Sequence, residues 1–580
     1  MDDRVVAMTH HGGVPHRRPP RALAVHGHFY QPPRENPWTE EVRTEASAAP
    51  AHDWNERITA ESYRPNGWAE VLDHGTVVAV HNNYENLSFN VGPTLTSWLA
   101  ASAPDVLARM VDGDRLGGGA IAQAYNHAIL PLADEADVRT QVRWGLADFR
   151  HRFGREAAGI WLPETAVSDA VLAVLAEEGV GFTLLAPAQA RRVRPLRRDR
   201  RADPRARWQD VADGSVDVRR TYRWLHPDDS DLGVDLVFYD GALSHELAFG
   251  IGSLPAAVLV DRALAHVGDG GLVCAATDGE TFGHHHRHAE RALAWALPVA
   301  APAAGLEVTT VAAHVAAHPP TWQAEVAVSA WSCAHGVGRW SSDCGCTTGG
   351  PGDTHGRWRA PLRAALDLVR DEGRAVFARR APRVLLDPAR ALDAYVEVLI
   401  GATPVEAFVA AHVLGGGSER AAVVEALTLL EQQRHAQLMY TSCAWFFWDL
   451  SGLETVQVLR YAARAMDLLE ELGEEPLIQA VLAVLATAES NVAEEGTGRD
   501  VWHRHVESAR VSSADVAAEA AALLADTEPI VGSTIGTHRV IRADGAILGL
   551  RWSGTVTLEH RRTLRRSDHH VTAAASAIAV

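Results

Sequence analysis

Two carboxylates stand directly after apolar runs in the first half of the chain. Glu164 closes the run AAGIWLPE, and Asp278 closes the run GLVCAATD. Each run is dense in apolar residues, as a strand buried on both faces should be. If both strands belong to one parallel barrel, their carboxyl ends meet at the same face, and the two side chains can share a pocket. Such a pair can cleave a glycosidic bond, because one carboxylate attacks the anomeric carbon while the other protonates the leaving oxygen.

Polar and aromatic residues near these carboxylates form a candidate substrate-binding set. His26 and His28 are two residues apart in VHGHFYQPP, so they share one face of a strand and can hydrogen-bond sugar hydroxyls or hold a metal. Glu280 follows Asp278 at the same spacing, and tryptophan rings can stack on sugar rings. The predicted substrate-binding residues are His26, His28, Gln31, His127, Trp161, Glu280, Trp331 and His335.

Each carboxylate also has a structural interpretation. Glu164 can be a charge at a helix N-terminus near Thr165 and Ser168. Asp278 can cap a helix that begins in the following turn. Gly279 and Gly283 in DGETFG permit a sharp turn or a close approach of substrate.

Two segments rich in histidine or cysteine raise the question of a metal. The run GHHHRHAE (283–290) is predicted to open a helix rather than to bind a metal. The segment WSCAHGVGRWSSDCGC (331–346) lacks the paired CxxC spacing of common zinc sites, so a substrate-facing loop is favoured over zinc. The sequence therefore predicts neither a metal nor another cofactor.

Seven apolar runs that alternate with helical patterns must position these residues. Strand–helix alternation implies parallel strands joined by crossovers, and seven strands suggest a barrel one strand short of eight. A doubly wound open sheet is the competing architecture. The runs span 22–30, 77–83, 120–127, 157–164, 179–186, 234–240 and 271–278.

The second half of the chain changes to the 3.6-residue period of packed helices. The fold class is therefore α/β, with an incomplete (β/α)7 barrel followed by a helical domain and a small β-type C-terminal element. The predicted divisions are a disordered tail (1–20), the barrel (21–300), a connecting and active-site loop segment (301–355), the helical domain (356–526) and the C-terminal segment (527–580).

Composition excludes several classes of function. The 580 residues carry a formal net charge of −19, which argues against nucleic acid and anionic membranes as partners. Five cysteines are too few for a disulfide scaffold in so long a chain, and no apolar run reaches the ~20 residues that span a bilayer. We expect a cytoplasmic enzyme with a carbohydrate substrate. The sequence does not predict its oligomeric state.

Taken in order along the chain, these motifs resemble glycoside hydrolase family 57, whose members act on α-glucans as amylases, branching enzymes and 4-α-glucanotransferases. VHGHFYQPP resembles the first motif of the family, with Phe29 and Tyr30 between His28 and Gln31. IWLPE resembles the nucleophile motif, DGETFG the acid/base motif, and NHAILPL a segment of the branching-type members. The resemblance implies a retaining enzyme with Glu164 as nucleophile and Asp278 as acid/base.

Two other functions are compatible with the same residues. A metal-dependent carbohydrate hydrolase, such as a polysaccharide deacetylase or an α-mannosidase, could recruit His26, His28, Asp278 and the GHHHRH run. A catalytically weak glucan-binding protein could also keep the barrel, although both carboxylates are intact. His285 and His286 stand where branching-type members usually have Trp, which leaves the choice between hydrolysis and transfer open.

Overall fold

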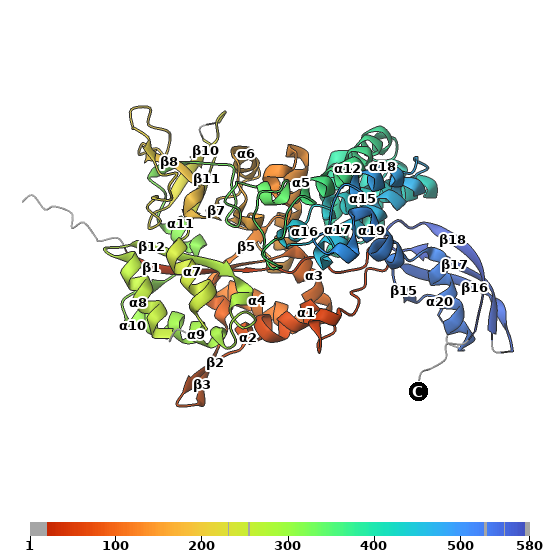
Figure 1. Cartoon of the computed structure of the whole chain (residues 1–580), viewed down its shortest axis with the longest axis horizontal. Helices are drawn as coiled ribbons and strands as arrows, with labels where there is room; N and C mark the ends of the chain where they lie inside the picture. The colour runs from red at the N-terminus through yellow and green to blue at the C-terminus, as the bar shows by residue number, and fades with distance from the viewer. Residues whose placement is uncertain (1–19, 230, 253–255, 527–529, 550, 575–580) are drawn as a thin grey trace, which may run out of the picture.

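A computed structural model describes residues 20–574, apart from 230, 253–255, 527–529 and 550. Residues 1–19 of the predicted tail lie outside the described residues. The barrel occupies one end of the molecule, the helical domain lies beside it, and a small sheet forms the far end (Figure 1). The predicted α/β fold with an incomplete barrel, a helical domain and a C-terminal β element is confirmed.

Seven parallel strands form the barrel, in the order β11-β7-β6-β5-β4-β1-β12. An isolated bridge between Gly159 and Phe182 joins β6 to β7. A backbone hydrogen bond of 2.6 Å from Asp240 to Cys274 links β11 to β12, where a paired ladder is missing among the described residues. The strands are β1 (Arg21–Phe29), β4 (Ser88–Val91), β5 (Ala120–Gln123), β6 (Ile160–Trp161), β7 (Phe182–Leu185), β11 (Gly233–Phe238) and β12 (Gly271–Asp278).

Alternation along the strands separates the inside of the barrel from the outside. Ala22 and Ala24 of β1 pack inside with Cys274 of β12, in one buried cluster. Their neighbours Leu23 and Val25 belong to the larger core beneath the surrounding helices. The inward positions of β1 therefore continue through His26 to His28, and the register places His28 opposite Asp278. On β1, the polar residues thus face the interior toward the carboxyl end of the strand.

The strand predicted at 77–83 is not part of the barrel. Residues 76–81 form β3 (Thr76–His81), which pairs only with β2 (Ala69–Asp73) in a hairpin that projects from the molecule (Figure 1). Val78 is 58% exposed, so this run has the apolar sequence of a buried strand but lies at the surface. The barrel strand at this point is β4, whose sequence SFNV places Ser88 and Asn90 inward beside the histidines.

Helices connect the barrel strands and cover them. These helices are α3 (Pro93–Ser102), α4 (Pro104–Gly117), α5 (Glu135–Phe153), α6 (Asp169–Glu177), α7 (Gly241–Gly250), α8 (Ala256–Val267), α9 (Ala289–Trp295) and α11 (Val311–Ala317). A second sheet extends from β7 and β11 through β10 (Tyr222–Leu225), β14 (Trp322–Val326), β8 (Ala190–Pro195) and β9 (Gln209–Asp210). β14 leads into the long loop that contains Trp331 and the Cys/His segment.

The helical domain packs around a separate core. Trp340, Trp358, Trp445 and Trp502 are fully buried in it. Its main helices are α12 (Arg359–Arg380), α13 (Pro388–Leu399), α14 (Val405–His412), α15 (Arg420–Leu438), α16 (Cys443–Phe446), α17 (Leu453–Glu471) and α18 (Ile478–Leu485). Helix α20 (Ser513–Ala525) instead shares a core with the antiparallel sheet of β15 (Thr534–Ile535), β16 (His538–Leu548), β17 (Arg551–His560) and β18 (Arg566–Ala574).

The helical domain contacts the barrel at its carboxyl edge. An isolated bridge joins Ala128, after β5, to Thr441, between α15 and α16. The next residue, Ser442, donates its backbone N–H to the His127 carbonyl at 2.9 Å. The segment that starts α16 is therefore fixed above the barrel where the candidate site residues lie.

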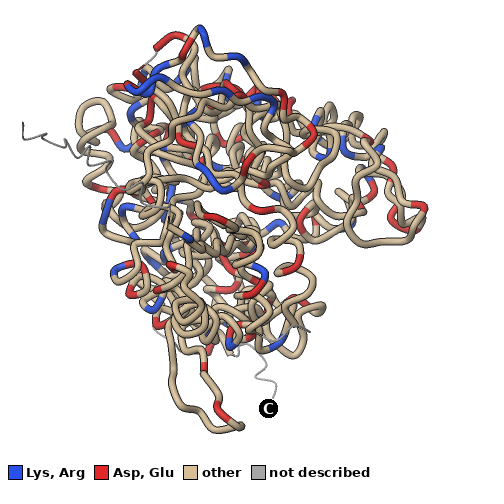
Figure 2. The backbone as a smooth tube through the Cα atoms, turned by 90° about the vertical axis from the view of Figure 1, so that its left-hand side faces the viewer, with Lys and Arg blue, Asp and Glu red and all other residues tan. Residues whose placement is uncertain are grey.

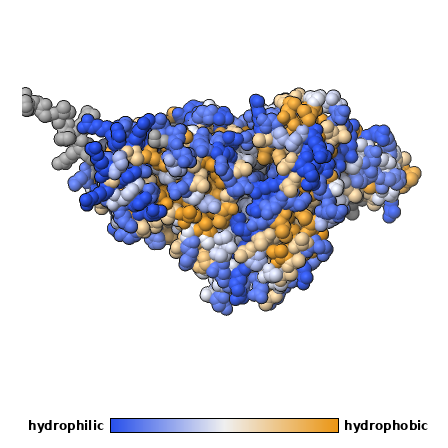
Figure 3. All heavy atoms as spheres, turned by 90° about the horizontal axis from the view of Figure 1, so that it is seen from above, coloured by the Kyte–Doolittle hydropathy of each residue, from blue (hydrophilic) through white to orange (hydrophobic). Residues whose placement is uncertain are grey.

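The distribution of charged residues on the surface is compatible with a neutral substrate. On the face drawn in Figure 2, acidic and basic residues are interspersed. Seen from above, hydrophobic residues gather near the middle of the molecule among hydrophilic ones (Figure 3). Among the described residues, no helix has both the length and the apolar character needed to cross a membrane.

Candidate active site

A cleft of about 740 Å³ opens at the carboxyl edge of the barrel. Both candidate catalytic carboxylates line it. The helical domain contributes to the opposite wall, so the cleft lies between the two units. Its lining includes His28, Tyr30, Gln31, His127, Glu164, Tyr239, His245, Phe249, Asp278, Glu280, His284, His285, Trp331, Ser332, Cys443, Phe446 and Phe447.

Two donors from the loop after β14 hold the Glu164 carboxylate. The indole Nε1 of Trp331 donates to Oε2 at 2.9 Å, and the Ser332 hydroxyl donates to the same oxygen at 2.6 Å. Burial raises the pKa of Glu164 above its usual range, and these two hydrogen bonds oppose the rise. Among the described residues no donor contacts Oε1, so this oxygen can face a substrate.

The backbone at Glu164 is in a conformation that L-residues rarely adopt. Glu164 has a φ of 57° and Thr165 a φ of 49°. The surroundings stabilise this turn, because Gln189 donates to the Thr165 carbonyl at 2.7 Å and accepts from its hydroxyl at 2.9 Å. The Trp331 backbone N–H also donates to the Glu164 carbonyl at 3.0 Å. Strain of this kind is concentrated at functional sites, where it directs a side chain.

Asp278 ends β12 and points into the cleft. Its side chain is exposed to the cleft, but the surrounding protein atoms desolvate it and raise its pKa to about 7, with a further contribution from the charge of Glu164. The two carboxylates are therefore close enough to interact electrostatically. A carboxyl group with such a pKa still carries its proton in much of the population at neutral pH, as a general acid requires.

The turn after Asp278 has room only for glycine. A Cβ on Gly279 would lie 2.2 Å from the Phe29 ring, and Gly283 has a φ of 124° beside the Glu61 carbonyl. The sequence suggested a sharp turn or a close approach of substrate at these glycines. In the structure the groups that come close are protein groups, and they set the direction in which Asp278 leaves the strand.

Glu280 lies beside Asp278 but is tied to the wall of the cleft. The Tyr63 hydroxyl and the Tyr30 backbone N–H both donate to its Oε1, the latter at 3.3 Å. Burial raises the pKa of Glu280 to about 8, and the charge of Asp278 adds to the rise. Gln31 extends the same network, since its amide donates to the Tyr63 oxygen at 3.2 Å. Glu280 and Gln31 therefore line the cleft, and their hydrogen bonds also hold the segment that follows β1.

His28 and His127 form a neutral pair at the bottom of the cleft. Their Nε2 atoms are 3.2 Å apart, and the Nδ1 of His127 lies 2.6 Å from the Ser442 hydroxyl of the helical domain. Burial lowers the pKa of His28 to about 3, and it lowers the pKa of His127 as well. Neutral imidazoles can exchange hydrogen bonds with sugar hydroxyls without adding positive charge that would lower the pKa of the acid.

His26 and Trp161 lie beneath this pair rather than in the cleft. Both side chains are 0% exposed, and the Trp161 ring stacks on His26 and His28 with centroids 4.9 Å apart in each case. The ring nitrogens of His26 are engaged by Ser88 and Asn90, at 3.1 Å each. Their position favours support of His28 over direct contact with substrate.

Of the two residues in the 331–346 loop that were predicted to bind substrate, only Trp331 lines the cleft. Trp331 lines the cleft and contacts Glu164, whereas His335 lies with Cys333, Cys344 and Cys346 outside the cleft lining. The aromatic run at 445–448 also divides, because Trp445 is buried in the helical core while Phe446 and Phe447 line the cleft.

Sequence reasoning missed several residues that shape the site. Tyr63 and Asn90 sit in segments without a motif, and Ser442 comes from a different domain. Ser332 could have been found, since it follows Trp331 directly. What reveals these residues is their contact with a predicted one, which only the folded chain provides.

The hydrogen bonds in the cleft do not favour the metal-dependent alternative. Ser88 and Asn90 engage both nitrogens of His26. His286 pairs its Nε2 with the Ala248 carbonyl at 2.8 Å, and His284 pairs with Glu61. Because a metal ligand needs a free lone pair, His26 is not available to a metal, whereas His284 and His286 each use only one ring nitrogen in these contacts.

Removing the Ser332 hydroxyl provides a test of how Glu164 is held. The change Ser332→Ala should raise the pKa of Glu164, because the lost hydrogen bond favours the ionised form. The acid limb of the pH profile of kcat/KM should therefore move to higher pH. Ser329→Ala is the matched control, since the Ser329 hydroxyl donates only to the Ala327 carbonyl in the described structure. An unmoved acid limb would contradict the assigned hydrogen bond.

A barrel with two carboxylates facing one cleft at its carboxyl edge is an arrangement that glycosidic bond cleavage requires. A comparison with family profiles agrees. Residues 55–326 match glycosyl hydrolase family 57, and residues 355–544 match a domain of unknown function, DUF3536. Residues 55–326, which include Glu164 and Asp278, are a domain of glycosyl hydrolase family 57. The protein is therefore a glycoside hydrolase or a glycosyl-transferring enzyme, as predicted.

Solved structures share the fold at low sequence identity. An exo-type maltose-forming amylase from Pyrococcus sp. ST04 is 14% identical, with 80% of this chain and 82% of that chain covered and a TM-score of 0.60. A family 57 branching enzyme from Pyrococcus horikoshii is 13% identical, with 85% and 97% covered and a TM-score of 0.47. The first supports the fold, and the second is too distant to add to it. No curated protein matches the chain.

Proposed function

We propose that the protein is a retaining glycoside hydrolase or transglycosidase that acts on α-glucans by double displacement. The observation that carries the proposal is the pairing of two unlike carboxylates in one cleft. Glu164 is held by two hydrogen-bond donors that stabilise its charge, whereas Asp278 has a pKa raised to about 7. Environments that separate the pKa values of two carboxyl groups assign the acid and the base.

In the first step, Glu164 attacks the anomeric carbon while Asp278 gives its proton to the leaving oxygen. The bond from the anomeric carbon to that oxygen breaks, and a glycosyl–Glu164 ester forms with inverted configuration. Loss of the proton leaves Asp278 as a carboxylate. The Asp278 carboxylate then faces a neutral ester instead of an ionised Glu164, so the smaller, electrostatic contribution to its raised pKa is removed while the desolvation remains.

In the second step, the Asp278 carboxylate takes a proton from water or from a sugar hydroxyl as that oxygen attacks the ester. A second inversion restores the original configuration and frees Glu164. Water gives hydrolysis, and a glucan hydroxyl gives transfer. Phe446 and Phe447, from the helical domain, offer apolar surface for a sugar ring on the wall of the cleft.

The activity should have a bell-shaped dependence on pH. Glu164 must be ionised and Asp278 protonated, so kcat/KM should fall about tenfold per pH unit above about 7, as Asp278 loses its proton. It should also fall below the raised pKa of Glu164. Because the two carboxyl groups interact, the apparent pKa values of the two limbs describe the pair and not either residue alone. A profile measured from pH 4 to 9 checks this, and a flat profile between pH 7 and 9 would contradict the role of Asp278.

A product analysis tests the proposed substrate class. The purified protein should release or rearrange α-linked oligosaccharides from maltooligosaccharides, amylose or glycogen, and the first product should keep the α configuration by NMR. Glu164→Gln protein is the control for contaminating activity. Turnover of acetylated or mannose-containing polymers alone would favour the metal-dependent alternative. Binding of glucans without turnover would favour the non-catalytic one.

A further inference from the structure

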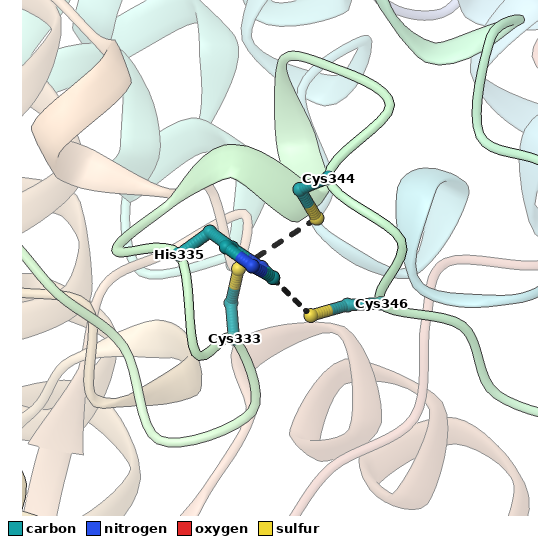
Figure 4. A group of neighbouring side chains, drawn as sticks. All are labelled: Cys333, His335, Cys344 and Cys346. Atoms are coloured by element: carbon teal, nitrogen blue, oxygen red, sulfur yellow. Dashed lines mark hydrogen bonds between the residues drawn. The ribbon is translucent and has the colours of Figure 1, made fainter.

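Four metal-binding side chains converge in the loop between β14 and α12. Cys333, His335, Cys344 and Cys346 each offer one ligand atom, and all four atoms lie within 4.8 Å of one another. Figure 4 shows the three thiols and the imidazole pointing toward one another. Consecutive ligands are separated by at most eight intervening positions, and Gly336 and Gly345 have φ of 74° and 81° in the turns that bring them together.

The spacing of the ligand atoms suits a tetrahedral zinc ion. With bonds of about 2.3 Å to sulfur and about 2.0–2.1 Å to nitrogen, tetrahedral geometry places two sulfurs about 3.8 Å apart and a sulfur and a nitrogen about 3.6 Å apart. The Sγ atoms of Cys333 and Cys344 are 3.9 Å apart, and the Sγ of Cys346 lies 3.6 Å from the His335 Nδ1. The sulfur separation is much longer than a disulfide bond of about 2.05 Å.

The surroundings fit an anionic centre. The Arg339 backbone N–H donates to the Cys333 sulfur at 3.4 Å, a contact that stabilises a thiolate ligand. Arg339 and Arg359 are only 6% and 1% exposed. Within the described residues, their side chains donate to the Thr348 hydroxyl and to the carbonyls of Phe446, Cys346 and Phe447 rather than to carboxylates. Buried cations need a counter-charge, and three thiolates with one Zn²⁺ carry a net charge of −1.

We propose that Cys333, His335, Cys344 and Cys346 form a structural zinc site that fixes the loop carrying Trp331 and Ser332. The four protein ligands close the coordination sphere, which is the arrangement of structural rather than catalytic zinc. On binding, the three thiols release their protons to solvent and become ligands. This interpretation replaces the substrate-facing role that the sequence suggested for His335. The unusual C-x-H…C-x-C spacing had argued against zinc, but the fold of the loop brings the ligands together.

The site connects the catalytic cleft with the helical domain. Cys333 directly follows the two residues that hold Glu164, and Trp340 in the same loop donates its Nε1 to the Ser442 carbonyl at 3.1 Å. Arg359, at the start of α12, donates to the Cys346 carbonyl at 2.7 Å. Zinc therefore orders the loop at the point where the barrel, the nucleophile and the helical domain meet.

Metal analysis of the full chain tests the site without reference to activity. The protein purified without chelator should contain about one zinc per chain by mass spectrometry of metals. Cys346→Ser and His335→Ala should each lose most of it, while Cys274→Ser, at a buried cysteine of β12, should keep it. His335→Cys should also keep it, because four thiolates hold zinc equally well. Cobalt added to the reduced, metal-free protein should give the absorption of tetrahedral thiolate-bound Co²⁺.

The catalytic consequence is a separate readout. If the proposed function is correct, Cys346→Ser should lower kcat by about 10²-fold with a lower Tm, since a displacement of ~1 Å at the reacting groups costs that much. His335→Ala should have the same two effects, whereas His335→Cys, which keeps four zinc ligands, should stay close to the wild-type kcat and Tm. Full chain that contains no zinc and gives no tetrahedral cobalt spectrum would overturn the zinc site, as would a Cys333–Cys344 disulfide in the native protein. Zinc present without any glycosidase activity would overturn the proposed function alone.

Discussion

Replacement of Glu164 by Gln should reduce kcat on an α-glucan by at least about 10³-fold, because the amide cannot form the covalent ester on which double displacement depends. The fold should be unaffected. The amide oxygen of Gln can still accept the hydrogen bonds from Trp331 and Ser332, so Tm should stay within a few degrees of the wild-type value. Initial rates by reducing-sugar release and a thermal melt measure the two effects.

Glu177→Gln is the matched control for this substitution. Glu177 lies on α6, outside the cleft, and pairs with Arg139 on the surface. It should retain nearly full activity. If Glu164→Gln keeps more than about a tenth of the wild-type kcat, Glu164 is not the nucleophile, whatever its position in the cleft.

Replacement of Asp278 by Asn should lower kcat on a natural glucan by about 10²–10⁴-fold, the usual contribution of general acid–base catalysis. The effect should depend on the leaving group. A glucosyl fluoride or an aryl glucoside needs little protonation, so the first step should survive and the glycosyl-enzyme should accumulate. With such a substrate, the limb of the pH profile near 7 should disappear, because the group that titrates there is gone.

Azide separates the two roles by stereochemistry. In Asp278→Asn, azide needs no general base and attacks the ester on Glu164, so the product should be the α-glucosyl azide after two inversions. In Glu164→Gln, azide can only replace the missing nucleophile, which gives the β-azide after one inversion. If NMR finds the β-azide with Asp278→Asn, the two assignments must be exchanged.

The sequence predicted the barrel and the two carboxylates for the same physical reason. A strand buried on both faces is a short apolar run, and a polar residue at its end stands out, as Glu164 and Asp278 do. The same criterion wrongly selected residues 77–83, because an exposed hairpin can also be apolar. It missed β4, because the polar residues Ser88 and Asn90 interrupt the apolar pattern of this buried strand. The catalytic roles themselves remain predictions.

Contacts between distant segments were beyond the reach of sequence patterns. Ser332 and Glu164 are 168 positions apart, and His127 and Ser442 are 315 positions apart, yet each pair is in hydrogen-bond contact. No local period encodes such pairs. Alternation correctly predicted that His26 and His28 share the inward face of β1. It could not predict how far each lies below the surface, so His26 was expected in the cleft although the structure buries it beneath His28.

Trapping of the covalent intermediate tests the central claim most directly. A fluorinated α-glucosyl fluoride, which forms the ester readily and hydrolyses slowly, should add one glucosyl residue to the wild-type protein. Peptide mapping by mass spectrometry should place this group on Glu164 in the segment GIWLPET. Asp278→Asn protein should be labelled at the same residue, and Glu164→Gln protein should not be labelled. A label on Asp278 or Glu280, or turnover of glucans with no covalent adduct and an inverted product, would contradict the account.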